Sequence, residues 1–106
     1  MATTQKMLYR GVLGTSSATL YTVPGSTSTI ITSIVVTNYT ATDATVTLTL
    51  QDGSGTDINL LYQVPVAGKG TLTMDISQVL NTTRIIKGLA SAGSSIACHI
   101  SGVEIT

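Results

Sequence analysis

The chain has 106 residues, of which 42% are hydrophobic and 9% are charged. This length fits one domain with a modest two-layer core and is too short for two independent domains. Five basic and five acidic residues leave no net charge, so no basic field is present to attract a nucleic-acid backbone, and the apolar content excludes a disordered chain.

Residues 1–6 lack the basic-then-apolar order of a secretory signal. We expect them to form a flexible arm on a single domain that spans residues 1–106, either free or laid along a neighbouring subunit. No apolar run approaches the length of a membrane span, so no membrane partner is expected. Cys98 is the only cysteine, so the chain has no intramolecular disulfide and suits a reducing cytoplasm.

The rest of the chain predicts an all-β fold, because no segment has helical periodicity and β-branched residues are frequent throughout. Pro24 and Pro65 mark strand ends or edges, since proline cannot donate to a sheet ladder. About eight short strands separated by turns favour a β-sandwich, either immunoglobulin-like or jelly-roll-like. One helical turn is expected within residues 75–81, where it would bring Val79 and Leu80 inward. The predicted strands cover residues 7–13, 19–23, 29–39, 44–51, 58–66, 71–76, 84–89 and 95–106.

The strand predicted at residues 29–39 carries apolar side chains on both faces. Strict alternation puts Ile30, Ile34 and Val36 on one side and Ile31 and Val35 on the other. We expect such a strand to be central in its sheet or to face a partner subunit, which favours a homo-oligomer.

The strand predicted at residues 44–51 has one apolar face and one hydroxyl face. Its apolar side belongs to a core, and its hydroxyl side is expected to face solvent or a neighbouring subunit. The charged fraction of the chain is well below the roughly one quarter that is usual for globular domains, which also favours packing within an assembly. The apolar set is Val46, Leu48 and Leu50, and the hydroxyl set is Thr45, Thr47 and Thr49.

A hairpin is predicted at residues 52–57, because this loop lacks the alternating acidic residues and the closing Glu of a calcium loop. In the strand that follows, alternate residues are expected to share one face. These are Ile58, Leu60, Tyr62, Val64 and Val66.

The last strand changes its apolar phase. Ile96, Cys98 and Ile100 share one phase, whereas Val103 and Ile105 have the other. We therefore expect a β-bulge at Ser101–Gly102 that returns the second apolar set to the core.

The sequence offers no catalytic, cofactor-binding or metal-binding constellation. Cys98 and His99 are neighbours on a strand and so point to opposite faces, which predicts a core cysteine beside a surface or interface histidine. The protein is therefore not expected to be an enzyme. A small hydrolase is the weakest alternative, because the many serines have no positioned base.

A glycan site is also disfavoured. The chain has no Trp and no Phe, and its four tyrosines lie within or at the end of apolar strands, where packing is expected rather than stacking on a sugar.

Several segments in order resemble small virion proteins encoded in the structural gene clusters of tailed bacteriophages. The resemblance covers residue 20 to the end of the chain and carries no catalytic residues. It implies a β-sandwich that decorates the phage particle, as a capsid cement protein or as part of a tail or fibre. The segments that carry it are Leu-Tyr-Thr-Val-Pro (20–24), Ile-Val-Val-Thr-Asn (34–38), Ala-Thr-Val-Thr-Leu (44–48), Val-Pro-Val (64–66), Leu-Thr-Met-Asp (72–75), Val-Leu-Asn (79–81) and Gly-Val-Glu-Ile-Thr (102–106).

We therefore expect a non-enzymatic decoration protein on the capsid surface of a virion, made in the host cytoplasm. Its expected partners are the major capsid protein and copies of itself. The alternative is a tail-fibre or baseplate module that binds host-surface glycans. The residues expected at interfaces are Ile31, Val35, Tyr39, Thr45, Thr47 and Thr49.

Overall fold

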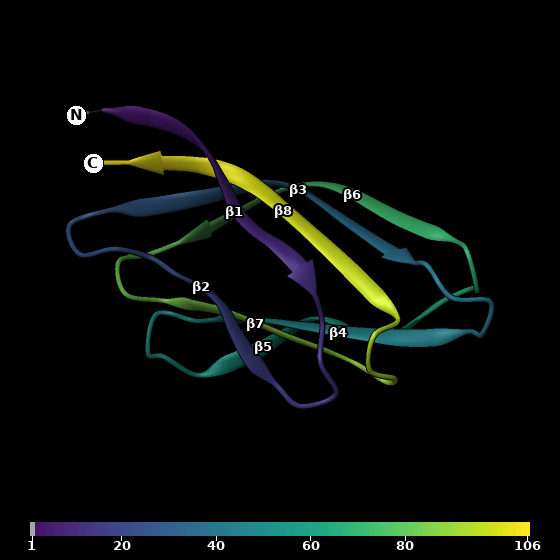
Figure 1. The fold of residues 1–106 in the computed structure, drawn as a ribbon. Helices are drawn as coiled ribbons and strands as arrows, with labels where there is room; N and C mark the ends of the chain where they lie inside the picture. Colours follow the sequence, from purple (N-terminus) through teal and green to yellow (C-terminus); the bar gives the residue numbers. More distant parts are fainter. Residues whose placement is uncertain (1) are drawn as a thin grey trace.

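The computed structural model describes residues 2–106 and contains eight strands in two antiparallel sheets (Figure 1). The all-β sandwich expected from the sequence is confirmed. The strands are β1 (Thr3–Val12), β2 (Ala18–Thr22), β3 (Ser28–Asn38), β4 (Ala44–Gln51), β5 (Asp57–Val66), β6 (Thr71–Leu80), β7 (Ile85–Ala90) and β8 (Ile96–Ile105).

The strand order identifies the sandwich as a jelly roll. One sheet has the order β1-β8-β3-β6 and the other has the order β2-β7-β4-β5. Only β4 and β5 are neighbours both in the sheet and along the chain, whereas an immunoglobulin sandwich pairs several consecutive strands as hairpins. Eight strands in two four-stranded sheets with these orders form the jelly roll, one of the two topologies that the sequence left open.

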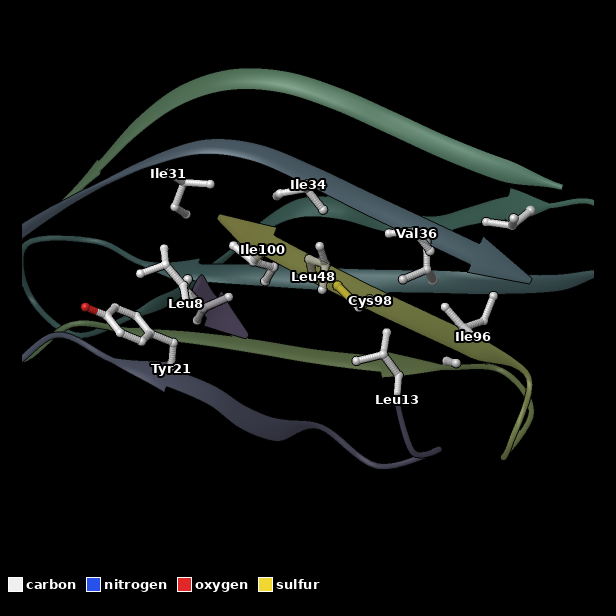
Figure 2. Close-up of a cluster of buried hydrophobic side chains, with 14 of the residues drawn as sticks. Leu8, Leu13, Tyr21, Ile31, Ile34, Val36, Leu48, Ile96, Cys98 and Ile100 are labelled. Carbon is white, nitrogen blue, oxygen red and sulfur yellow. The ribbon is translucent and has the colours of Figure 1, made fainter. Parts of the chain in front are cut away.

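The core lies between the two sheets and is made of aliphatic side chains from both (Figure 2). Ile34, Val36 and Ile100 enter it from the first sheet, while Val46 and Leu48 enter it from the second, all of them at most 1% exposed. Leu50 is partly buried and packs against this core, so the predicted apolar set of β4 lies on the core side, with Val46 and Leu48 fully buried. Cys98 is also fully buried, and burial raises the pKa of its thiol to about 12.

The β-bulge expected at Ser101–Gly102 is not in β8. The side chains of β8 alternate between inward and outward without interruption, and the unpaired extra residues are Leu8 in β1 and Thr32 in β3, on either side of it. Val103 therefore faces outward instead of returning to the core. A Cβ on Gly102 would lie 2.4 Å from the carbonyl oxygen of Ile30 and 2.8 Å from Cδ1 of Leu8. Only a glycine lets both neighbouring strands bulge at this level.

The bulge in β3 reverses which of its residues face the core. Before Thr32 the buried side chains are Thr29 and Ile31, and after it they are Ile34 and Val36. Both sets are at most 1% exposed, so the expected division into Ile30, Ile34 and Val36 against Ile31 and Val35 is wrong. Two apolar residues, Ile30 and Val35, are left on the outer face.

Three other predictions need correction. Residues 75–81 contain no helical turn, because β6 continues to Leu80 and leaves Val79 65% exposed. Residues 3–6, expected as an arm, form the start of β1 and pair with β8, and Met1 lies outside the described residues. In β5 two register shifts break the alternation, so Leu61 opposes the buried Leu48 and Tyr62 is 63% exposed.

We predict that Gly102→Ala lowers the free energy of unfolding by about 3 kcal/mol, because the new methyl group forces a backbone carbonyl to move. Denaturant unfolding measures the change. The matched control is Gly14→Ala, where a Cβ meets nothing within 4 Å, and it should change stability by less than about 0.5 kcal/mol. Equal stability of the two variants would contradict the role given to Gly102.

Candidate assembly surfaces

The outer face of the sheet β1-β8-β3-β6, here called the β3 face, carries exposed apolar side chains among serines, threonines and a few charged residues. Residues that pair directly across antiparallel strands point to the same side, so the register assigns its side chains. Met7, Val12 and Val79 on this face are 54%, 50% and 65% exposed, half of the large hydrophobic side chains that are exposed in residues 2–106. Ile30, Val35 and Val103 lie between them and are half-buried. Val103, Ile30 and Val79 lie side by side on three neighbouring strands and form an apolar row across this face.

The two edges of the β3 face differ in shape. At the β1 edge an open hollow of about 430 Å³ lies beside the bulge and is lined by Gln5, Lys6, Met7, Thr32, Ser101, Gly102 and Val103. At the β6 edge Val79 projects as an exposed apolar side chain. The row of directly paired residues Gln5, Val103, Ile30 and Val79 joins the hollow to this projection.

Two charged residues of opposite sign lie on the β3 face, one at each edge. Arg10 in β1 donates from Nε to Nδ1 of His99, at 3.0 Å, and His99 pairs with Val35. Asp75 in β6 pairs with Ser33 and is exposed, and it forms no salt bridge with any residue in the described chain. The face therefore carries a cation at one edge and an anion at the other.

The outer face of the second sheet, here called the threonine face, is less open than expected. Thr47 is 9% exposed, and its Oγ1 accepts a hydrogen bond of 3.1 Å from the backbone N–H of Gln63. Gln63 lies in a bulge of β5 with φ of 49°, so the threonine serves an irregular strand that the sequence pattern did not show. Thr45 and Thr49 are half-buried.

An ion pair spans the threonine face from β7 to β5. Lys87 Nζ lies 3.0 Å from Asp57 Oδ2, and Gln51 donates to Asp57 Oδ1 at 3.2 Å. These bonds hold the pKa of the Asp57 carboxyl below its ordinary value. Thr49 pairs directly with Lys87, and its Oγ1 is buried with no hydrogen-bond partner among residues 2–106.

The remaining predicted interface residues are divided between surface and core. Val35 lies on the β3 face, and Tyr39 is 50% exposed just beyond the end of β3. The buried Asn38 side chain fixes the loop beside Tyr39 by donating to the carbonyls of Thr42 and Val66 at 2.8 and 3.1 Å. Ile31 is 0% exposed in the core, because the Thr32 bulge turns it inward, so it offers no surface to a partner.

The sequence prediction missed Val79 and the two charges at the edges of the β3 face. Leu72, Met74 and Ile76 alternate inward, and the same alternation carried through to Leu80 places Val79 outward. That alternation could have identified Val79 as an outward-facing residue. No pattern within a single strand could have placed Arg10 and Asp75 on one face, because they belong to opposite edges of the sheet.

The core-cysteine prediction is confirmed: Cys98 is buried, and His99 is half-buried on the opposite face of β8. No group of three or more His, Cys, Asp or Glu side chains within residues 2–106 is placed to hold a metal ion. No helix in this part of the chain is long and apolar enough to cross a membrane.

A polar network closes the end of the sandwich where the two termini lie side by side (Figure 1). The Tyr21 hydroxyl, from the second sheet, donates to the carboxylate of Glu104 and lies 2.9 Å from Thr29 Oγ1. Lys6 Nζ lies 3.2 Å from Glu104 Oε2. Burial and the bond to Glu104 raise the pKa of Tyr21 to about 12, and the Tyr21 and Lys6 contacts lower the pKa of Glu104.

Comparison with solved structures finds chains that share this fold. A chain in the structure of infectious bursal disease virus, strain Gx, matches with a TM-score of 0.60 at 15% identity, over 98% of this chain and 32% of that one. A chain of the T13 particle of the same virus matches with a TM-score of 0.59 at 11% identity, over 97% and 30%. The protein thus spans about a third of the length of these viral chains.

A third similar structure comes from the Bacillus endospore appendages, described as a family of disulfide-linked pili. Its TM-score is 0.60 at 15% identity, over 99% of this chain and 88% of that one. No protein-family model and no curated protein matches the sequence. At these identities the comparisons show a shared fold.

We predict opposite effects for two neighbouring threonines. Thr47→Val leaves the Gln63 N–H without its acceptor and should lower the free energy of unfolding by about 1–2 kcal/mol. Thr49→Val removes a buried hydroxyl that has no partner, so it should be neutral or stabilising. Denaturant unfolding of both variants measures the difference, and equal losses would contradict the bonding described.

We also predict that Tyr21→Phe lowers the free energy of unfolding by about 2 kcal/mol at neutral pH, because it removes a hydrogen bond to a carboxylate. Folding lowers the pKa of Glu104, so its stabilisation is present above its ordinary value of 4.5 and is lost as pH falls through the folded-state value. Folding raises the pKa of Tyr21, so its stabilisation is complete below pH 10 and is lost as pH rises toward 12.

The free energy of unfolding measured across pH therefore checks the network at acid pH, through Glu104, and at alkaline pH, through Tyr21. Tyr21→Phe should reduce the dependence on pH at both ends, and Tyr62→Phe, at a 63% exposed position, should keep the wild-type profile. An unchanged profile for Tyr21→Phe would show that the network does not couple to folding.

Proposed function

We propose that this protein is a non-enzymatic structural subunit of a virus particle, a decoration or cement protein bound to the outside of a capsid shell. The observation that carries the proposal is a jelly-roll sandwich with exposed apolar side chains on its β3 face and with few charges on either outer face. Its fold similarity to chains of virus particles over nearly all its length adds support. The ordered segments that resemble tailed-phage virion proteins favour a bacteriophage particle.

In this role the protein acts through added contacts rather than chemistry. A decoration subunit that spans the junction between neighbouring shell subunits stabilises the shell by burying apolar area and making short-range hydrogen bonds. Many copies on one shell multiply weak single contacts. The partners are the major capsid protein and other copies of this chain, and Val35, Tyr39 and the half-buried Thr45 and Thr49 are surface positions available for them.

A filament subunit is the second candidate, because the match to the spore-appendage chain covers 88% of that chain, against about a third of the viral ones. Disulfide linkage, which defines those pili, does not transfer to this chain. Cys98 is its only cysteine, and it is fully buried with a raised pKa. A filament of this protein would need non-covalent contacts alone.

We predict that particles assembled without this protein rupture at lower temperature, and faster on dilution, than complete particles, because the contacts across shell junctions are missing. Release of packaged nucleic acid to a fluorescent dye measures rupture. Adding the purified protein back should restore the resistance. Equal resistance of depleted and complete particles would overturn the stapling role.

Labelled antibody on complete particles locates the protein in the same preparation. Label over the whole shell supports decoration. Label on tails alone would instead favour a tail-fibre or baseplate module, and label on separate fibres would favour the filament subunit.

A further inference from the structure

We propose that two copies of the chain pack against each other through their β3 faces, about a two-fold axis that runs along the strands between β8 and β3. The proposal deepens the proposed function, on which it rests for its biological role but not for its geometry. It identifies the surface that binds another copy and leaves the threonine face for the shell.

Rotation about this axis places each edge of the sheet in one copy over the opposite edge of the sheet in the other copy. Rotation about a line parallel to the strands lays β1 of one copy over β6 of the other, and β8 over β3, while each row of paired residues faces the same row of the partner copy. A two-fold contact is self-complementary, so each matched pair occurs twice.

The shapes of the two edges match under this rotation. Val79 and Gln5 belong to the same row, so the exposed Val79 of one copy lies over the hollow beside Gln5 and Met7 of the other. Val103 and Ile30, also in this row, face each other across the axis. The contact thus covers the most exposed apolar side chain of the face, which is otherwise left in water.

The charges of the two edges match as well. Arg10 of one copy lies over Thr73 of the other, because both belong to the row of Val35 and His99. Asp75 is in the next row, about 7 Å along the strand, within reach of an extended arginine side chain. Each Arg10 therefore pairs with the Asp75 of the other copy, and no like charges are opposed.

The area of the face is sufficient for a specific dimer. Four strands spaced about 4.8 Å apart, each about ten residues long, cover roughly 19 by 34 Å. Two such faces together bury about 1,300 Å², which lies at the lower end of the range for stable protein–protein contacts.

Sedimentation equilibrium of the purified chain tests the proposal without any virus particle, so its result is independent of the test of the proposed function. The wild type should form dimers with a dissociation constant of about 10 µM or tighter. In the Asp75→Arg variant the new arginine of each copy lies near Arg10 of the other copy. This repulsion occurs at two symmetry-related positions and should weaken dimerisation about 100-fold. The double variant Arg10→Asp with Asp75→Arg reverses both charges and should recover to within about tenfold of wild type.

Val79→Asp is a second test, because it replaces an apolar side chain that is 65% exposed with a charged one. This variant should also form no dimers at micromolar concentration. The controls are Lys69→Glu, in the loop between β5 and β6, and Tyr62→Asp, which is 63% exposed on β5. Both controls should dimerise as the wild type does. The proposal would be overturned by a wild type that is monomeric at about 100 µM or that forms a trimer. It would also be overturned if Asp75→Arg or Val79→Asp dimerised as tightly as the wild type, or if the double variant dimerised no more tightly than Asp75→Arg.

Discussion

The close packing of the Ile30 carbonyl and the Leu8 side chain against Gly102 shapes both the core of this protein and its outer surface. Because Gly102 has no side chain, the Ile30 carbonyl and the Leu8 side chain close against β8, and the two flanking strands each accommodate one extra residue there. The extra residue in β3 is Thr32, whose Oγ1 lies 3.2 Å from the Ser101 carbonyl oxygen. A side chain at residue 102 would push the strands apart at the point where β3 changes phase.

That change of phase explains how one strand serves two surfaces. Ile31 and Ile34 both reach the core although they are an odd number of residues apart, and Ile30 and Val35 both reach the outer face for the same reason. The sandwich therefore has a complete core and still presents apolar side chains outward. The few charged residues divide in a similar way: Lys87 with Asp57 and Lys6 with Glu104 form ion pairs within the chain, whereas Arg10 and Asp75 lie at opposite edges of the β3 face.

Features that depend on alternation within one strand could be predicted from the sequence. The core positions of β4 and the opposite orientations of Cys98 and His99 follow from a period of two. Features that depend on neighbouring strands could not. The bulges belong to β1 and β3 but are permitted by a glycine in β8, and the buried Thr47 accepts a hydrogen bond from a distant residue, Gln63, which has a positive φ. The choice of a jelly roll over an immunoglobulin sandwich depends on strand order, which no local pattern encodes. Of the candidate interface residues, Val35 and Tyr39 are on the surface, while Ile31 followed the bulge into the core.

The proposed function and the proposed dimer together give this small sandwich one face for its own copies and another for a shell. A density map of the intact particle tests this claim most directly. The expected result is density for this chain on the outer shell, in pairs whose β3 faces meet about local two-fold axes and whose threonine faces lie toward the capsid. Single sandwiches with β3 faces open to solvent, or density confined to the tail, would contradict it.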